Sequence, residues 1–162
     1  LSKGRTSSNA WCRAPCLANP HVQSAIAKIE EVTYIPSAHY ESFQILQYDA
    51  GQFYNTHHDM GERQKLLSCG PRILTFFLYL SDVEEGGETV FPTLDIKVKP
   101  KRGRALIWPS VKSDSPEEQD PRTVHAAAPV LKGKKYAANA WIHLYDFAKS
   151  NLWGCTGAFD YL

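Results

Sequence analysis

The sequence predicts a mainly β fold, an antiparallel sandwich or jelly roll with at least one flanking N-terminal helix. Three observations support this fold class. Helical periodicity occurs once, near the N-terminus, and about eight short β-rich segments follow it. Turn signals such as Gly86-Gly87 separate neighbouring segments. Two segments, 73–80 and 105–108, are apolar runs typical of buried strands, and such an element order indicates a sandwich or jelly roll.

The helix signal begins at Asn19-Pro20, where a capping residue precedes a proline at the first helical position. Apolar residues then recur at helical spacing, at Val22, Ile26, Ile29 and Val32. We expect the helix to end near Tyr34, because Pro36 disfavours its continuation.

Strand signals occupy the chain after this helix. We expect strands at 41–48, 52–59, 73–80, 96–98, 105–108, 123–130 and 135–144, with turns at 49–51, 84–88 and 132–134. Two polar loops, 61–71 and 109–121, flank segments that carry functional candidates. Such loops are either lids over a site or plain surface connections.

Composition limits the possible partners. The chain has 162 residues, enough for one domain spanning 1–162, and a net charge of +1, so no nucleic acid or other polyanion is implied. We interpret the basic clusters at 97–104 and 132–135 as solvated turns. No apolar run approaches membrane-spanning length. The chain opens at Leu1 without a secretory signal, so we expect a processed or truncated catalytic piece.

Four cysteines, Cys12, Cys16, Cys69 and Cys155, allow three pairings, and their spacing does not choose between them. Disulfides are favoured over free thiols. A zinc site is the least favoured alternative, because Cys69 and Cys155 lack neighbouring ligands in the sequence.

The strongest chemical signal is His57-x-Asp59 followed by a distant His125. Two histidines and one carboxylate form a facial triad that leaves half of an octahedral iron open. His57 and Asp59 should share one face of a strand, with His58 on the other face. Lys135 is a cation at the start of an apolar strand and could hold the far carboxylate of a dicarboxylic acid. An H-x-D tripeptide alone occurs often by chance, but the set suggests iron, 2-oxoglutarate and oxygen.

Longer stretches resemble the prolyl 4-hydroxylases of the plant and algal type, a family of 2-oxoglutarate/Fe(II)-dependent dioxygenases. They are also similar to the catalytic domain of the collagen-modifying enzyme. The matching segments are 5–9 (RTSSN), 48–59 (YDAGQFYNTHHD), 72–80 (RILTFFLYL), 84–92 (EEGGETVFP), 99–103 (KPKRG) and 125–143. The resemblance implies a double-stranded β-helix, that is, a jelly roll.

The resemblance also implies residue roles. His57, Asp59 and His125 match the iron ligands, and Lys135 matches the lysine that pairs with the 2-oxoglutarate C5 carboxylate. Other matching positions lie around the same site. By this resemblance, Tyr48 and Thr89 contact the cosubstrate. Tyr54, Arg72 and His143 line the peptide side of the site. Trp141 also lies on that side, and the resemblance makes it a cofactor-binding residue as well. Each position also has an ordinary structural alternative. Tyr48 and Trp141 could be core aromatics, Thr89 a simple strand residue and His143 a buried histidine.

Two departures from the family pattern stand out. An N-terminal segment that often carries a membrane anchor usually precedes the Arg5 motif, and the chain lacks it, so any membrane attachment would depend on that segment. Ala126-Ala127-Ala128 stands where a glycine or another turn-forming residue is common. We expect the alanines to leave iron binding intact.

The resemblance implies hydroxylation of peptidyl proline at C4 in proline-rich proteins, coupled to oxidative decarboxylation of 2-oxoglutarate to succinate. It implies Fe(II), 2-oxoglutarate and O2, with ascorbate (vitamin C) as reductant, and a disulfide-isomerase-type subunit as a candidate partner. The family works in the lumen of the endoplasmic reticulum and Golgi, so we expect at least one disulfide, most readily Cys12–Cys16. Two alternatives remain: another peptidyl or small-molecule substrate, or a catalytically silent jelly-roll binding module.

Overall fold

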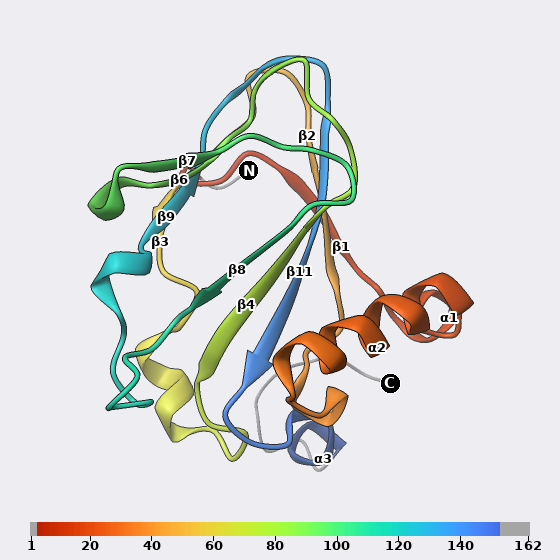
Figure 1. Ribbon diagram of the computed structural model, residues 1–162, viewed down its shortest axis with the longest axis vertical. Coiled ribbons are helices and arrows are strands. Elements are labelled where there is room, and N and C mark those ends of the chain that lie inside the picture. Colours follow the sequence, from red (N-terminus) through yellow and green to blue (C-terminus); the bar gives the residue numbers. More distant parts are fainter. Residues whose placement is uncertain (1–2, 153–162) are drawn as a thin grey trace.

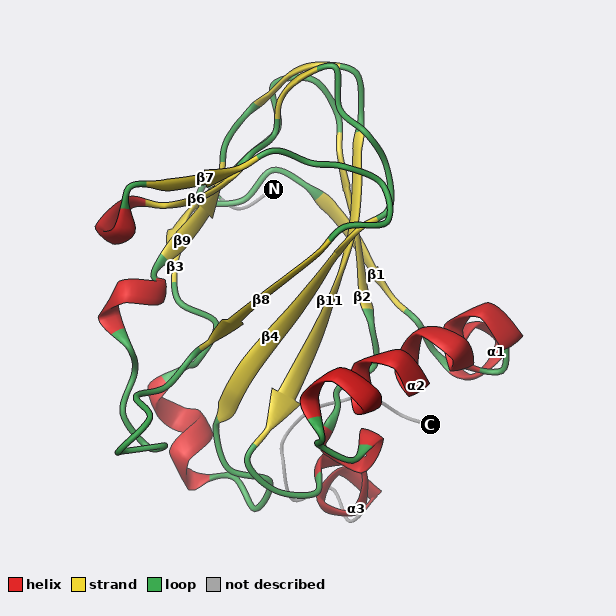
Figure 2. Ribbon diagram, in the orientation of Figure 1, coloured by secondary structure: helices red, strands yellow, loops and turns green. Residues whose placement is uncertain are grey.

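Two antiparallel sheets face each other in the computed structural model, which describes residues 3–152 (Figure 1). The larger sheet has the strand order β1-β2-β11-β4-β8, and the smaller sheet has the order β3-β9-β6-β7. Strands β5 and β10 form a separate pair. Figure 2 shows helices α1, α2 and α3 on the side of the larger sheet that faces away from the smaller one. The predicted jelly-roll class with a flanking N-terminal helix is confirmed.

The strands are short, and several are only two to four residues long. Their bounds are β1 Ser8–Trp11, β2 Gln44–Tyr48, β3 Tyr54–His57, β4 Arg72–Tyr79, β5 Glu85–Gly86, β6 Thr89–Phe91, β7 Ile96–Val98, β8 Ala105–Pro109, β9 His125–Ala127, β10 Val130–Lys132 and β11 Lys135–His143. Helices are α1 Ala14–Leu17, α2 Pro20–Thr33 and α3 Phe147–Leu152, and 3-10 turns are η1 Ser37–His39, η2 Glu62–Leu66, η3 Pro92–Leu94 and η4 Pro121–Thr123.

Helix α2 begins and ends where the sequence predicts. The Asn19 side chain accepts a hydrogen bond from the His21 backbone N–H at 2.9 Å, and Tyr34 adopts the left-handed conformation that ends the helix. Ile29 on its inner face is buried with the apolar side chains of the outer surface of the larger sheet, including Phe76 and Ile142. This packing fixes the helix on the sheet. No helix among residues 3–152 is long and apolar enough to cross a membrane.

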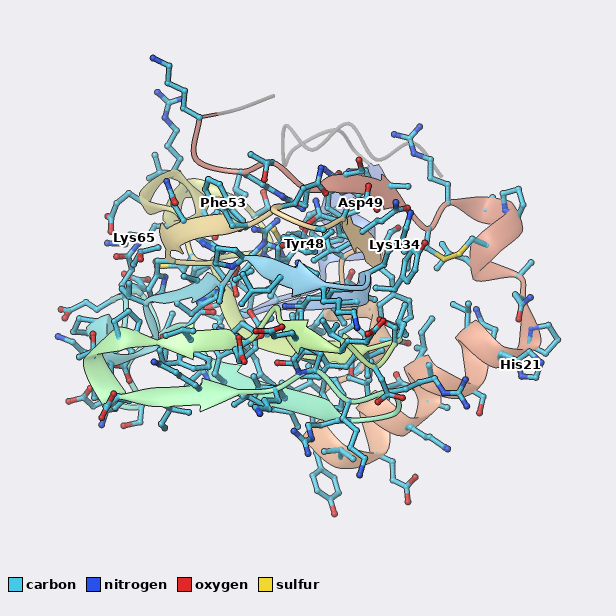
Figure 3. The ribbon with its side chains drawn as sticks, turned by 90° about the horizontal axis from the view of Figure 1, so that it is seen from above. His21, Tyr48, Asp49, Phe53, Lys65 and Lys134 are labelled. Carbon is cyan, nitrogen blue, oxygen red and sulfur yellow. A yellow bond between two sulfur atoms is a disulfide. The ribbon has the colours of Figure 1, made fainter. Side chains whose placement is uncertain are left out.

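A disulfide joins Cys12, just after β1, to Cys16 in α1, as expected, and appears as a yellow bond in Figure 3. Cys69 is a buried free thiol, and Cys155 lies outside the described residues. A zinc site built on the Cys12–Cys16 pair is therefore wrong, because both sulfurs are covalently bonded to each other.

Several strand predictions are wrong in part. The strand expected at 123–130 is interrupted, because β9 ends at Ala127 and β10 begins at Val130 in a different sheet. The strand expected at 52–59 ends at His57, and Asp59 lies in the bend that follows. Strand pairing explains the early end, because the β3–β9 ladder has His57 opposite His125 as its last pair. The segment 105–108 is not a buried strand. β8 is the edge of the larger sheet, so Ile107 is 41% exposed, and Trp108 alone in that strand is buried.

The sequence also misses β1, whose residues show no clear alternation. β1 is a strand because it pairs with β2 along its whole length, from Ser8 opposite Gln47 to Trp11 opposite Gln44.

Between the two sheets, aromatic residues dominate the buried core, which contains Leu46, Tyr48, Phe77, Tyr79, Phe91 and Trp108. This core forms one wall of the cavity described next.

Candidate metal centre and cosubstrate pocket

Three potential metal ligands converge between the sheets. The Nε2 atom of His57 lies 3.9 Å from Oδ1 of Asp59, and Nε2 of His125 lies 3.6 Å from Oδ2. All three ligand atoms lie within 4.8 Å of one another. His57 and His125 come together because they are opposite residues in the β3–β9 ladder. Asp59 reaches the same point from the bend after β3, not from a strand face as the spacing suggested.

Hydrogen bonds aim these ligands at a common centre. Nδ1 of His57 lies 2.8 Å from the carbonyl of Asn55, and Nδ1 of His125 lies 2.9 Å from the carbonyl of Thr123. Because a carbonyl only accepts, each Nδ1 carries the proton and each Nε2 presents its lone pair to the centre. The Thr75 hydroxyl donates to Oδ2 of Asp59 at 2.6 Å. This donor set and its outer partners fit a divalent cation such as Fe(II).

Electrostatics also prepare the centre for a cation. Burial, together with the nearby His125, lowers the pKa of His57 to about 4, so its imidazole is neutral at physiological pH. Burial opposes ionisation of Asp59, but His125 and the Thr75 hydroxyl outweigh it and hold the Asp59 pKa below its usual value. The neutral His57 imidazole beside the buried Asp59 carboxylate therefore gives a site that favours a cation.

The triad opens into a cavity that holds about 370 Å³ of empty space, including its mouth. Both sheets line it, with Tyr48, Phe77 and Lys135 from the larger sheet and Tyr54, Thr89 and His125 from the smaller one. The sequence-predicted cosubstrate residues Tyr48, Thr89 and Lys135 therefore share one pocket with the triad.

Lys135, which lines this pocket, is fully buried. Its Nζ donates to the Gly87 carbonyl at 2.8 Å and lies 5.2 Å from the Tyr48 ring centroid. Burial lowers the pKa of Lys135 to about 8. No described carboxylate forms an ion pair with Lys135, whereas the neighbouring Lys134, labelled in Figure 3, pairs with Asp49 at 2.9 Å on the surface. A buried cation without a carboxylate partner is a candidate anion site.

Three further pocket residues shape this site. The Tyr79 hydroxyl donates to Thr89 Oγ1 at 2.7 Å, which leaves the Thr89 hydroxyl hydrogen available to a ligand. The Tyr54 ring stacks on His57 with centroids 3.7 Å apart, and the guanidinium of Arg5 lies 4.9 Å from the centroid of the Tyr54 ring. The contacts of Tyr54 with His57 and Arg5 fix the side of the pocket nearest the metal centre.

Arg72, His143 and Trp141 lie in a second cluster, not in the lining of this pocket. Arg72 Nη2 donates to Oε2 of Glu41 at 2.9 Å, and the Arg72 guanidinium stacks 3.6 Å above the Trp141 ring. Arg72 Nη1 also donates to the backbone carbonyl of Asp59 at 3.3 Å, which connects the cluster to the triad. The indole N–H of Trp141 is buried and has no hydrogen-bond partner among residues 3–152.

His143 is held as an imidazolium. Its Nε2 lies 2.8 Å from Oε1 of Glu41, and its Nδ1 lies 2.8 Å from the Gly70 carbonyl, so both nitrogens donate to acceptors. Burial opposes this charge, but Cys69 and Glu41 outweigh it and raise the His143 pKa to about 9. Burial likewise opposes ionisation of Glu41, but Arg72 and His143 lower its pKa to about 2.

Sequence reasoning missed Glu41, Thr75 and Asn139. Glu41 is 8% exposed although it stands at the start of a predicted strand, where a carboxylate usually faces solvent. Asn139 lines the pocket between Lys135 and the second cluster, and its Nδ2 is 3.4 Å from Oε1 of Gln44. A signal was available for Asn139, because residues 135, 137, 139, 141 and 143 alternate on one face of the last strand.

Comparisons with known proteins agree with this geometry. The model of the 2OG-Fe(II) oxygenase superfamily matches residues 43–143. "Probable prolyl 4-hydroxylase 3" of Arabidopsis thaliana is 33% identical, with 90% of this chain and 56% of that protein covered. "Prolyl 4-hydroxylase subunit alpha-1" of Gallus gallus is 36% identical, with 86% and 27% covered. The chain spans about half the length of the curated plant relatives it matches.

A solved structure is similar over most of its length. The viral collagen prolyl hydroxylase from Paramecium bursaria chlorella virus 1, in complex with 2OG, has a TM-score of 0.74 and 31% identity. The match covers 87% of this chain and 80% of the viral chain. The fold around the triad is therefore shared with an enzyme solved with 2-oxoglutarate bound.

Proposed function

The chain belongs to the 2OG-Fe(II) oxygenase superfamily, and we propose that it hydroxylates proline at C4 in proline-rich peptides, with 2-oxoglutarate as cosubstrate. One observation carries the proposal: Lys135 is fully buried, has no carboxylate partner in the described part of the chain, and shares a pocket with the His57–Asp59–His125 triad. A metal-binding triad and a buried cation that line the same pocket together suit a dicarboxylic acid. The similarity to prolyl 4-hydroxylases supports proline as the target.

The residues of the site would have separate roles in metal binding, cosubstrate binding and water exclusion. His57, Asp59 and His125 would hold Fe(II), which together with O2 supplies the oxidising chemistry that decarboxylates 2-oxoglutarate and replaces a C4–H bond with C4–OH. Lys135 would donate a charge-assisted hydrogen bond to the C5 carboxylate of 2-oxoglutarate. Thr89 and Tyr48 would complete the walls around that carboxylate. The aromatic core on the same side would exclude water.

On the peptide side, we assign Tyr54 to the wall nearest the metal. Arg72 and Trp141 would act from the adjoining cluster, in which His143 and Glu41 hold the guanidinium of Arg72 above the indole ring. The Trp141 N–H is buried and has no partner in the described part of the chain, so it would become a donor to a peptide carbonyl only if binding exposes it. An extended proline-rich chain is a suitable occupant, because it has free carbonyls and little conformational freedom to lose on binding.

Four wider features are part of the proposal. The Cys12–Cys16 disulfide supports an oxidising compartment, and we propose the lumen of the endoplasmic reticulum or Golgi. Ascorbate would serve as reductant. A disulfide-isomerase-type subunit is the proposed partner, since a relative named "subunit alpha-1" works as part of an assembly. Any membrane attachment would come from a segment outside this chain.

The test is to incubate the purified chain with Fe(II), 2-oxoglutarate, ascorbate and a proline-rich peptide. Mass spectrometry should find one added oxygen on proline and succinate in matching amount. Succinate that depends on iron but leaves the peptide unmodified would indicate a different substrate. Absence of iron-dependent succinate would indicate a silent binding module and contradict the proposal. The Lys135→Ala variant should lose succinate formation at ordinary 2-oxoglutarate concentrations.

A further inference from the structure

We propose that His58, which stands between two of the metal ligands, is a positioning residue that holds the third ligand, His125, in place. The inference rests on the metal centre of the proposed function and does not depend on the identity of the substrate. His58 lies in the bend after β3, and both of its ring nitrogens bond to groups outside the triad. It is therefore not available as a ligand itself.

The hydrogen bonds of His58 define its tautomer. The Met60 backbone N–H donates to Nδ1 of His58 at 3.1 Å, so this nitrogen carries no proton. The proton is on Nε2, which lies 3.1 Å from the backbone carbonyl of Asp120. The neutral ring thus joins the bend that carries Asp59 to a segment about sixty residues further along the chain.

The carbonyl of Asp120 also accepts the hydrogen bonds that close η4, the 3-10 turn that precedes His125. It accepts hydrogen bonds from the Thr123 backbone N–H at 3.1 Å and from the Thr123 hydroxyl at 3.0 Å. The carbonyl of Thr123 in turn binds Nδ1 of His125 at 2.9 Å. A continuous chain of hydrogen bonds therefore runs from His58 through the η4 turn to the ring of His125.

The strands alone provide little restraint on the approach of His125 to the other ligands. The β3–β9 ladder consists of two residue pairs, Tyr54 with Ala127 and His57 with His125, and its register shifts between them. β9 also pairs with β6, but only through Ala126 and Ala127, so neither of those pairs includes His125. A second tie supports His58, because Nε2 of Gln119 donates to the carbonyl of Met60 at 2.6 Å.

Burial increases the effect of this connection. Asp120 is 2% exposed and Thr123 is 6% exposed, so water cannot readily replace a bond lost between the two segments. Loss of the His58 ring should free the η4 turn to shift and tilt His125 away from the centre. Removal of such outer partners typically weakens metal binding by about 10–100-fold.

The test is calorimetric titration of the metal-free chain with Mn(II). The His58→Ala variant and the similarly sized His58→Phe variant should both weaken binding by about tenfold or more, with cooperative unfolding retained. The His58→Gln variant should recover most of the affinity, because its amide N–H can reach the Asp120 carbonyl. His39→Ala is the matched control, since His39 also binds a backbone carbonyl, that of His143, at 3.1 Å but lies apart from the triad. Its Mn(II) affinity should not change.

Three results would overturn the inference. Mn(II) affinity within about twofold of the unsubstituted chain in His58→Ala or His58→Phe would show that His125 needs no such support. Equal weakening in His58→Gln would show that the bond to Asp120 is irrelevant. Failure of both His58→Ala and His58→Phe to fold would make His58 a general structural residue. By contrast, failure of the unsubstituted chain to bind Mn(II) would overturn the metal centre itself, and the inference with it.

Discussion

Replacing Lys135 with methionine should separate cosubstrate binding from fold stability. Methionine fills a similar volume without the charge. In the proposed complex the substitution leaves a buried carboxylate without its partner, which costs about 3–5 kcal/mol. Since about 1.4 kcal/mol corresponds to a factor of ten, the KM for 2-oxoglutarate should rise by about two to four orders of magnitude.

The stability of the unliganded chain should respond differently. The lowering of the Lys135 pKa from 10.5 to about 8 corresponds to about 3 kcal/mol of destabilisation by the buried charge. This destabilisation is complete below pH 8 and fades as the pH rises towards 10.5. Methionine removes it but leaves the Gly87 carbonyl without its donor, which costs about 1–3 kcal/mol. The two effects nearly cancel, so Tm at pH 7 should stay the same or rise slightly.

The assay is succinate formation against 2-oxoglutarate concentration at fixed Fe(II), with thermal unfolding measured in parallel. Lys134→Met is the matched control, because Lys134 is exposed and pairs with Asp49 on the surface. It should change neither KM nor Tm by much. A KM within about threefold of the unsubstituted chain in Lys135→Met would refute Lys135 as the anchor. A large loss of Tm with unchanged KM would show that Lys135 stabilises the fold and does not bind the cosubstrate.

Three further predictions follow from the site and its surroundings. Substitution of any triad ligand by alanine should abolish Mn(II) binding in calorimetry and succinate formation in the turnover assay, and persistence of both would contradict the triad. The raised pKa of His143 should stabilise the fold fully below pH 6.5, and about 3 kcal/mol should be lost as the pH rises through 9. Urea unfolding at pH 6.5 and at pH 8, below the range in which Lys135 contributes, should show about 2 kcal/mol of this loss, and His143→Phe should remove that difference. Thiol titration of the denatured, unreduced protein should find fewer than four free thiols; four would contradict the disulfide.

The sequence predicts the long elements of this fold well, because their signals are local. The cap at Asn19 and the apolar spacing of Val22 to Val32 define α2, and the continuous apolar run after Arg72 defines β4. β1 and the burial of β8 depend instead on pairing and on position within the sheet. Residue patterns contain no information about which strand will lie at an edge.

The candidate site shows the same division. His57, Asp59, His125 and Lys135 could be selected because their types and spacing have a chemical reason, and the structure places them in one pocket. Glu41 could not be selected, since its importance comes from burial beside Arg72 and His143, which are distant in sequence. The register of Asp59 was misjudged, because the strand ends two residues before it, although the residue still reaches the centre.

The most direct test of the central claim is turnover of a proline-rich peptide under isotopically labelled oxygen gas. If the triad and Lys135 hold iron and 2-oxoglutarate in one pocket, one labelled oxygen atom should enter the proline ring and the other should enter succinate, in equal amounts. Both products should disappear in His125→Ala. Unlabelled succinate, or an added oxygen that comes from water or lies on a residue other than proline, would contradict the account.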